Sequence, residues 1–295
     1  AAAAATAAAA AAAAVYVAYW RSRRERARGT HEESAEERDA RLRAALAPLE
    51  RGLTVYWAGE SPCARRVLIT LREKGLEYKN CVVSLLHGEQ RHAAFLQINP
   101  QGKVPVLVCR GVDGVEDCVI FESAAIVTWL DEAFPHTKQL LPSARAARWE
   151  ARLWQYWELC IAEEFWPLSR MQVDGVLWRW GYAPREFEEA KKLMGGGDPF
   201  YTSKISNICR GTYLTPQEML CHQVRISRGF SMLERALGDG RRFLVGGAFS
   251  IADVSVLPRL LKAPINGILA TEAQRRKHKH VCAYFEGLRA RESLL

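Results

Sequence analysis

Alternating apolar and polar residues near position 53 predict a short strand that leads directly into a helix. Every second residue of 53–57 is apolar, as in a half-buried strand, and Gly59, Ser61 and Pro62 then end the alternation. Apolar residues next recur at helical spacing among charged ones; the apolar positions are Val67, Leu68, Leu71 and Leu76, and the charged positions are Arg65, Arg66, Arg72, Glu73 and Lys74. The pattern predicts a strand, a turn and an amphipathic helix that begins at Pro62.

Ser61 falls at the N-terminal end of this predicted helix. Pro62 suits the first turn, because the N–H that proline lacks would have no partner there. Unpaired backbone N–H groups and the helix dipole make this end favourable for a negative charge. We therefore expect a thiolate held beside Ser61 to have a lowered pKa.

The pattern extends this domain to residue 134. We expect a loop at 99–105 that enters a third strand ending near Cys109, and a helix opened by Glu122 and Ser123. The remaining elements are a second strand at 77–83, a short helix at 90–98, a fourth strand at 118–121 and the helix body at 124–132. The predicted order is βαβαββα, an α+β domain spanning 53–134.

Helical patterns alone fill the chain from 143 to 295. A long helix is expected at 143–169, and another starts with Thr215 as its cap and runs to about 237. Ser250, with Asp253 three residues later, is typical of a third helix start. The first of these helices has an apolar stripe that we interpret mainly as core, with some of it lining a pocket beside Ser61: Trp149, Leu153, Tyr156, Trp157, Cys160 and Ile161.

Residues 1–20 are nearly all alanine and carry no charge. As a helix they would extend roughly 30 Å, the thickness of bilayer hydrocarbon. Tyr16, Tyr19 and Trp20 lie at one end, where interfacial aromatics are common, and a run of five arginines follows within 21–28. We predict a single transmembrane helix at 1–20; an alanine-rich helix on a protein surface and a targeting remnant are the alternatives.

The predicted anchor has consequences for partners and location. Small alanine side chains allow close approach of other membrane helices, so we expect other subunits of a membrane complex as neighbours. Anionic lipid is expected near Arg21–Arg28, and 21–52 is predicted to be a charged linker helix with a capping box at Thr30 and Glu33. The arginines place the soluble part on the matrix or stromal side of an organellar membrane, with the mitochondrial inner membrane preferred over a chloroplast membrane.

Composition narrows the chemistry. The net charge is +8, yet no nucleic-acid-binding signature is present, so lipid or protein partners are expected and nucleic acid is not. Eight cysteines are scattered without a CxxC pair, which favours free thiols over a zinc site or a disulfide framework. No metal site is predicted.

Four motifs in order resemble the glutathione transferases. They are Ser61-Pro62-Cys63, EKGLEY at 73–78, NPQGKVPVL at 99–107 and ESAAIVTWL at 122–130. The resemblance implies a thioredoxin-like domain at 53–134 and an all-helical domain at 143–295, in which the extra length at about 170–215 is an insertion. It is closest to the classes that use Ser or Cys, called zeta, tau and omega, and the Ser-x-Cys spacing is most similar to zeta, which includes cis–trans isomerases.

The resemblance also implies roles in binding glutathione. Val104 would pair its backbone with the cysteinyl part of the ligand, before a cis Pro105. Glu122 and Ser123 would hold the γ-glutamyl end, and Lys103 would face the glycyl carboxylate. The hydroxyl of Ser61 would donate a hydrogen bond to the glutathione thiolate, with the thiol of Cys63 and the hydroxyl of Tyr56 as alternative catalytic groups.

Two functions are consistent with the sequence. The first, which we prefer at this stage, is an accessory subunit of a membrane complex, such as a respiratory-chain complex, built on a transferase-like body that still binds glutathione. The second is an active membrane-tethered glutathione transferase or isomerase that acts on small electrophiles. The N-terminal segment favours the first function, and the intact set of glutathione residues favours the second.

Overall fold

The computed structural model describes residues 35–85, 88–169, 203, 206–208, 210 and 212–294. The sheet-containing part has the elements α2 (Ala35–Leu46), β1 (Gly52–Trp57), α3 (Pro62–Glu73), β2 (Lys79–Val82), η1 (Glu89–Arg91), α4 (Ala93–Leu96), β3 (Val106–Arg110), β4 (Cys118–Phe121) and α5 (Ser123–Ala133). It is followed by α6 (Arg145–Ser169), α10 (Pro216–Ala236), α11 (Ile251–Lys262), η3 (Pro264–Asn266), α12 (Glu272–Lys277), α13 (Lys279–Leu288) and η4 (Glu292–Leu294). The predicted order of an α+β domain before helices alone is confirmed.

The chain forms two compact units. One contains residues 34–158, 240–259 and 284–295, and the other contains 1–33, 159–239 and 260–283. We call them the sheet unit and the helical unit. The helices α6, α11 and α13 each contribute residues to both.

The sheet unit is built on four strands in the order β2-β1-β3-β4. β1 pairs with β2 in parallel and with β3 in antiparallel fashion, and β3 pairs with β4 in antiparallel fashion. The parallel pair requires a crossover, which α3 provides. The two central strands are buried along most of their length, as expected for a sheet covered on both faces.

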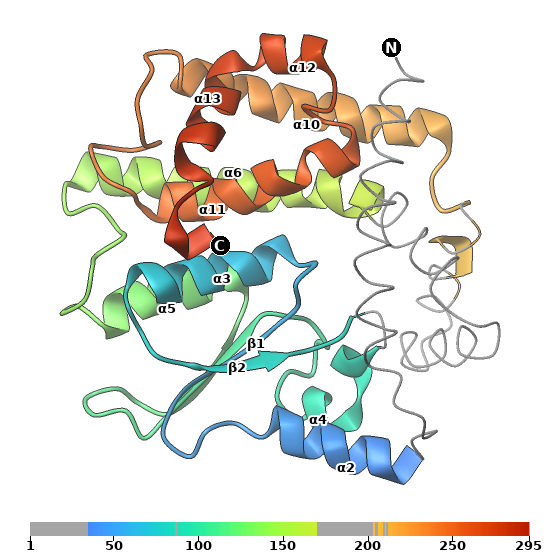
Figure 1. Cartoon of the computed structure of the whole chain (residues 1–295), viewed down its shortest axis with the longest axis vertical. Coiled ribbons are helices and arrows are strands. Elements are labelled where there is room, and N and C mark those ends of the chain that lie inside the picture. Colours follow the sequence, from blue (N-terminus) through green and yellow to red (C-terminus); the bar gives the residue numbers. More distant parts are fainter. Residues whose placement is uncertain are drawn as a thin grey trace. The chain divides into compact units, whose positions relative to one another are not determined.

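Helices cover both faces of this sheet (Figure 1). On one face, α2 and α4 pack over Tyr56, Val106 and Val108. On the other face lie α3 and α5, which pack against each other, and α5 also contacts β3 and β4. Alternation along β1 and β3 turns Val55 and Leu107 toward α3 and α5.

The segment before β1 differs from the linker predicted at 21–52. Leu42 and Leu46 of α2 are 4% and 3% exposed and belong to the core of the sheet unit. The carbonyl of Leu46 also accepts a hydrogen bond from the Tyr56 hydroxyl. At least the part of this segment from Ala35 onward is therefore part of the folded unit, because its two leucines complete an apolar layer.

The apolar stripe predicted as core on α6 is mostly exposed. Trp149, Leu153 and Tyr156 are 59%, 67% and 65% exposed, and Cys160 is exposed as well, whereas Ile161 is buried. The buried face of this helix instead carries Ala151, Trp154, Glu158, Ile161, Phe165 and Leu168. Helical spacing identified an apolar face of α6, but the face that packs is displaced from it by one residue along the helix.

The predicted helix starts of the C-terminal part are confirmed. Thr215 accepts from the Glu218 backbone N–H, and the Glu218 carboxylate accepts from the Thr215 N–H, which completes a capping box at α10. At α11 the Asp253 carboxylate accepts from the Ser250 N–H at 2.9 Å. It also accepts from the Leu244 N–H and the Tyr284 hydroxyl, so this cap joins three segments of the sheet unit.

In the helical unit, aromatic contacts connect the helices. Phe165 of α6 packs against Phe230 of α10, and Phe230 packs edge-on against His278, with ring centroids 6.2 and 6.1 Å apart. The Glu164 carboxylate lies 2.7 Å from the His222 ring nitrogen Nδ1. These contacts fix α6, α10 and the start of α13 within that unit.

Several predictions made for the N-terminal region and for 170–215 lie outside the described residues. They are the transmembrane helix at 1–20, the Thr30–Glu33 cap and most of the predicted insertion. Within the ranges that the structure does describe, no helix is both long enough and apolar enough to cross a bilayer.

The C-terminal end of α3 is held by a buried carboxylate. The Glu73 side chain is 5% exposed and accepts hydrogen bonds from Arg291, Lys138 and Ser293, the first two with opposite charge. Burial alone would raise the pKa of Glu73, but these hydrogen bonds outweigh it and lower the pKa from 4.5 to about 2. The ionised carboxylate therefore stabilises the fold.

Replacing Glu73 tests this contribution. A carboxylate with a lowered pKa adds stability that is present above about pH 4.5 and is lost as the pH falls toward about 2. We expect Glu73→Gln to lower the free energy of unfolding by about 2–3 kcal/mol at pH 7, and by progressively less below pH 4.5. Urea denaturation of both proteins at several pH values measures this difference.

Glu286→Gln is the matched control, because Glu286 pairs with Arg289 at the surface and is 59% exposed. Its effect should stay within about 0.5 kcal/mol. A Glu73→Gln protein as stable as wild type at pH 7, or a difference that does not change with pH, would contradict the assigned role.

Candidate functional site

The sheet register brings three loops to one edge of the sheet. Tyr56 of β1 pairs with Val106 of β3, and Val106 pairs with Phe121 of β4. β1 ends at Trp57, β3 begins at Val106 and β4 ends at Phe121, so the segments 58–61, 103–105 and 122–123 all leave the sheet at this edge. Every residue predicted for the site except Tyr56 and Cys63 lies in these segments, and Cys63 follows in the first turn of α3.

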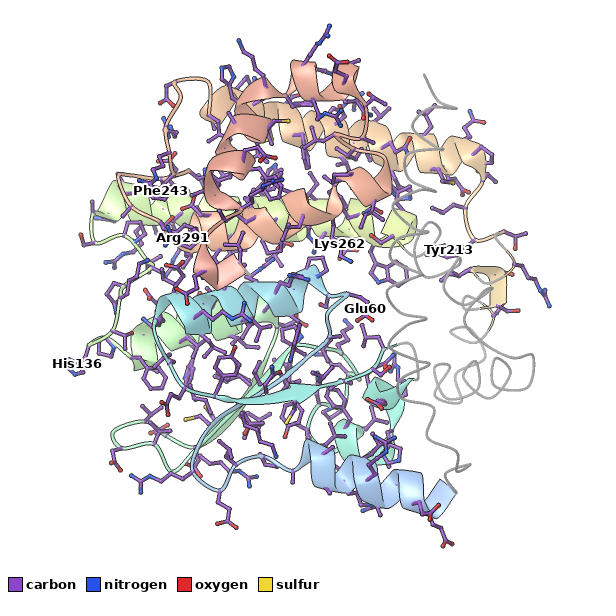
Figure 2. All side chains as sticks on the ribbon, in the orientation of Figure 1. Glu60, His136, Tyr213, Phe243, Lys262 and Arg291 are labelled. Atoms are coloured by element: carbon purple, nitrogen blue, oxygen red, sulfur yellow. The ribbon has the colours of Figure 1, made fainter. Side chains whose placement is uncertain are left out.

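Ser61 caps α3. Its backbone is extended, Pro62 occupies the first helical position, and the hydroxyl oxygen accepts from the Ala64 N–H at 3.2 Å. Figure 2 shows Glu60, its neighbour, at the N-terminal end of this helix. Accepting that bond uses only a lone pair of the hydroxyl, and among the described residues its hydrogen has no acceptor. Ser61 can therefore cap the helix and donate to a ligand at the same time.

Tyr56 is not available to a ligand. Its side chain is fully buried, and its hydroxyl donates to the Leu46 carbonyl at 2.6 Å. Burial raises the pKa of Tyr56, and the neighbouring Cys81 acts in the same direction. Among the three predicted catalytic groups, the geometry favours Ser61 and Cys63 over Tyr56.

The loop at 99–105 presents backbone at the site. The Val104–Pro105 peptide bond is cis, as predicted. Asn99 donates to the Lys103 carbonyl at 2.9 Å, and Gly102 has a φ of 59°. A Cβ at Gly102 would lie 2.9 Å from the Gln90 carbonyl oxygen, so only glycine fits this turn. Pro105 is buried, Val104 is half-buried and Lys103 is exposed, which leaves the lysine side chain open to a ligand.

Glu122 and Ser123 open α5 in a strained conformation. Glu122 has a φ of 68°, a value that non-glycine residues rarely adopt and that costs about 1–3 kcal/mol. Its side chain is exposed and makes no capping bond, while Ser123 is 4% exposed as the first residue of the helix. Strain of this kind is often found where a backbone must present groups to a ligand.

A buried ion cluster lies behind the first turn of α3, and the sequence analysis missed it. Arg66 was predicted on the polar face, but it is fully buried and forms an ion pair with Glu158 of α6. Arg259 of α11 donates to the other oxygen of Glu158 at 2.5 Å. The Arg259 guanidinium also lies 3.5 Å from the Cys63 sulfur. All four residues belong to the sheet unit.

The ion cluster carries a net positive charge beside the site. Burial lowers the pKa of Arg66 to about 10, the neighbouring Arg259 lowers it too, and Cys63 and Glu122 oppose the change. Arg66 therefore stays charged at neutral pH, and in the described ranges its Nε and Nη1 have no hydrogen-bond partner, while Nη2 is the atom of the ion pair with Glu158. One signal was present in the sequence, because Arg66 shares a helix face with Cys63 and Thr70, at spacings of three and four residues.

The arrangement is suited to an anion. The N-terminal N–H groups of α3, the spare hydrogen of Ser61 and the charge of Arg66 all favour negative charge at the same place. A thiolate or a carboxylate there would be stabilised by fixed groups that need not reorganise.

Comparisons with known proteins agree with this geometry. A family model described as the N-terminal domain of glutathione S-transferase matches residues 60–133, and one described as the C-terminal domain matches 175–260. The second match includes most of the segment at about 170–215, which we predicted to be an insertion because the chain is longer than the family pattern. The zeta-class glutathione S-transferase of Euphorbia esula is 30% identical over 215 residues, which are 72% of this chain and 76% of that protein.

Other relatives have related activities in their names. A probable maleylacetoacetate isomerase of Vibrio cholerae is 34% identical over 211 residues, covering 70% of this chain and 79% of that protein. Two Arabidopsis thaliana glutathione S-transferases are 46% identical, but the chain spans only 40% and 39% of their lengths. The crystal structure of the β-etherase LigF from Sphingobium covers 82% of this chain and 97% of its own, with a TM-score of 0.65 and 26% identity.

Breaking the ion cluster should destabilise the sheet unit. Glu158 is 1% exposed, and Glu158→Gln would leave the Arg66 and Arg259 charges buried without their shared carboxylate. We expect a loss of about 3–5 kcal/mol in the free energy of unfolding, measured by urea denaturation. Glu150→Gln is the control on the same helix, because Glu150 is 45% exposed and lies 3.6 Å from Arg241. Equal stabilities of the two variants would show that the cluster contributes nothing.

Proposed function

The chain belongs to the glutathione S-transferase superfamily, and from this premise we propose that it is a glutathione-dependent transferase or cis–trans isomerase. The observation that carries the proposal is the Ser61 hydroxyl, which caps α3 and keeps its hydrogen for a ligand beside a buried positive charge. This combination is what activation of a thiol requires.

Glutathione has two carboxylates, one ammonium and one thiol, and the sheet edge offers a group for each part. The γ-glutamyl carboxylate would lie at the N-terminal end of α5, where Ser123 and the first backbone N–H groups donate, and the Glu122 carboxylate would face the ammonium. The backbone of Val104 would pair with the cysteinyl part like an added strand. The exposed Lys103 would meet the glycyl carboxylate.

The cysteinyl thiol would then lie at the N-terminal end of α3. A free thiol of this type has a pKa near 8.5, so most of it is protonated at neutral pH. Donation from Ser61, the helix N-terminus and the charge of Arg66 all stabilise the thiolate and lower its pKa. The proton leaves to solvent, and the thiolate is ready to attack an electrophilic carbon.

Two reactions can follow from this thiolate. In a transfer, the sulfur bonds to carbon and the leaving group departs with the electron pair. In an isomerisation, the sulfur adds to a conjugated double bond, the resulting single bond rotates, and elimination restores glutathione. The names of the relatives include a zeta-class transferase, an isomerase and a β-etherase, which supports electrophiles of this kind as substrates.

Cys63 gives a second catalytic candidate within the same function. Its half-buried sulfur lies 3.5 Å from the Arg259 guanidinium, in the first turn of α3. A deprotonated Cys63 would attack glutathione disulfide, forming a mixed disulfide and releasing one glutathione thiolate, so a test of Ser61 must include Cys63.

Replacing Ser61 tests the proposal. We expect Ser61→Ala to reduce turnover with a model electrophile by about 10²-fold, the scale for losing one preorganised donor, with retention on glutathione-agarose nearly unchanged. The thiolate absorbance of bound glutathione should titrate at higher pH in the variant than in wild type. Tyr56→Phe is a control for the hydroxyl that points away, and it should keep full turnover.

The outcomes separate the candidates. Full turnover in Ser61→Ala with loss in Cys63→Ser would transfer the catalytic role to Cys63. Wild type that is folded, yet neither binds glutathione-agarose nor turns over any electrophile, would contradict the proposed function. Because removing a cap also costs about 0.5–2 kcal/mol of stability, each turnover is compared at a temperature where circular dichroism shows the variant folded.

The accessory-subunit role that we preferred from the sequence finds no support among the relatives. We therefore propose the enzymatic function in its place. The membrane anchor at 1–20 and the organellar, matrix-side location remain proposals that rest on the alanine-rich helix pattern and the arginines at 21–28. Neighbouring membrane subunits and anionic lipid are proposals of the same kind.

Carbonate extraction tests the anchor. If residues 1–20 span a bilayer, the native protein should stay in the membrane pellet, and deletion of 1–28 should release it while the glutathione site is kept. Complete extraction of the intact protein by carbonate would rule out the span and leave the enzyme proposal untouched.

A further inference from the structure

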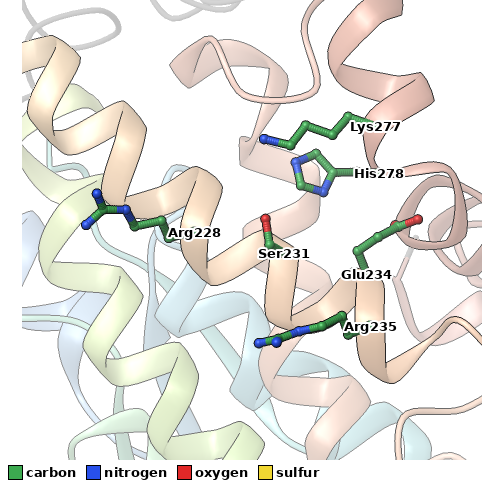
Figure 3. Close-up of a pocket in the computed structure, with 6 residues that line it drawn as sticks. All are labelled: Arg228, Ser231, Glu234, Arg235, Lys277 and His278. Carbon is green, nitrogen blue, oxygen red and sulfur yellow. The ribbon is translucent and has the colours of Figure 1, made fainter.

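A second cluster of charges lies in the helical unit and takes no part in the proposed reaction. It lines an open pocket of about 490 Å³ formed by Arg228, Ser231, Glu234, Arg235, Lys277 and His278. Figure 3 shows Lys277 and His278 above Ser231, with Arg228 one turn before it along α10 and Arg235 one turn after. The basic run at 275–280 contributes the two residues from α12 and the segment after it.

The cations around this pocket are not matched by protein anions. Arg228, Arg235 and Lys277 are exposed, and no side-chain partner is found for them in the described part of the chain. The single carboxylate is already occupied, since Glu234 accepts from the backbone N–H groups of His280 and Val281 and lies 2.8 Å from the His280 ring nitrogen. Among the residues that the structure describes, the pocket is therefore left with three positive charges that no carboxylate pairs.

His278 adds a buried polar group without a partner. It is 3% exposed and packs edge-on against Phe230, yet its ring nitrogen Nδ1 makes no hydrogen bond with any other residue that the structure describes. A buried polar atom without a partner is uncommon in folded proteins, and a bound water or ion is one way in which it is satisfied. This imidazole lines the pocket, and turning its ring would bring the buried Nδ1 to a group bound there.

We propose that this pocket binds a phosphate group. Three cations from two segments, together with one buried ring nitrogen that can donate, match a compact anion that has several oxygens and nearly two charges. Arginine forks bind two phosphate oxygens at once, and the lysine adds a mobile point charge. The pocket volume leaves room for the group that carries the phosphate, whether a soluble phosphate ester or a lipid headgroup.

Binding is measured on the full chain with inorganic phosphate and with a simple phosphomonoester, at constant ionic strength set by chloride. Calorimetry gives the affinity, and the imidazole resonances in a ¹H–¹⁵N spectrum report on His278 directly. We expect phosphate, and not chloride, to bind and to move the His278 resonances. Arg228→Gln and Lys277→Gln should each weaken binding by about tenfold, the usual scale for a charged hydrogen bond.

Arg276→Gln is the matched control. Arg276 lies in the same basic run, is 78% exposed and pairs with Glu272 outside the pocket, so its loss should change the affinity by less than about twofold. All variants should remain on glutathione-agarose as wild type does, which shows that the fold and the glutathione site are intact. A failure of glutathione binding in wild type would concern the proposed function alone.

Vesicles distinguish the two sources of phosphate. Phosphatidylcholine vesicles with phosphatidic acid are compared with phosphatidylcholine alone, using wild type, Arg228→Gln and Arg276→Gln. Binding of soluble phosphate identifies a phosphate ester, whereas binding only to phosphatidic acid, lost in Arg228→Gln and kept in Arg276→Gln, identifies a lipid headgroup. If neither form binds, or if the pocket variants bind as wild type does, the proposal is wrong.

Discussion

The buried ion pairs of Glu158 with Arg66 and Arg259 are the interaction on which the candidate site depends. They join α3, α6 and α11, three helices that are far apart in the sequence and that meet in the sheet unit. Removing three charges from water costs several kcal/mol per ion, and the shared carboxylate of Glu158 offsets part of that cost for both arginines. Two arginines share one carboxylate, and the positive charge that remains lies beside Cys63 at the first turn of α3.

Helix α3 is fixed at both ends and in the middle, and this rigidity positions the site. At its N-terminal end Ser61 caps the backbone, and at its C-terminal end Glu73 is held by Arg291, Lys138 and Ser293. A carboxylate at a helix C-terminus opposes the helix dipole, and the two cations offset that cost. The next residue, Lys74, is buried against Asp131 at 2.9 Å, which ties α3 to α5. These contacts would hold the proposed thiolate in one place.

Local rules predicted most of the fold, because strands, caps and turns are determined by a few adjacent residues. The strand at 53–57, the cap at Thr215 and the Ser250–Asp253 pair were all found in the structure, and the cis Pro105 followed from the resemblance. The strand is buried on both faces, however, and not half-buried as its alternation predicted. The errors concern burial, which depends on distant residues. Arg66 was predicted to be a surface charge, because its partner Glu158 lies on another helix. The apolar stripe of α6 was predicted to be core, because helical spacing identifies an apolar face but not the residues that cover it. The Leu42 and Leu46 pair was assigned to a linker for the same reason.

The site residues that the motifs identified differ from Arg66, which the motifs missed, in the kind of interaction by which they would contribute. In the proposed site, Ser61, Val104, Glu122 and Ser123 would act through backbone geometry and short hydrogen bonds, which neighbouring residues in the chain determine. Arg66 would act through a field that exists only after α3 and α6 pack. A serine at the cap has one lone pair for the helix and one hydrogen for a ligand, so the same hydroxyl can serve the fold and the chemistry without compromise. The charge of Arg66 would share with the Ser61 hydrogen the stabilisation of a bound negative charge. The two contributions are separable, because the hydrogen bond of Ser61 is local and the charge of Arg66 depends on how α3 packs against α6.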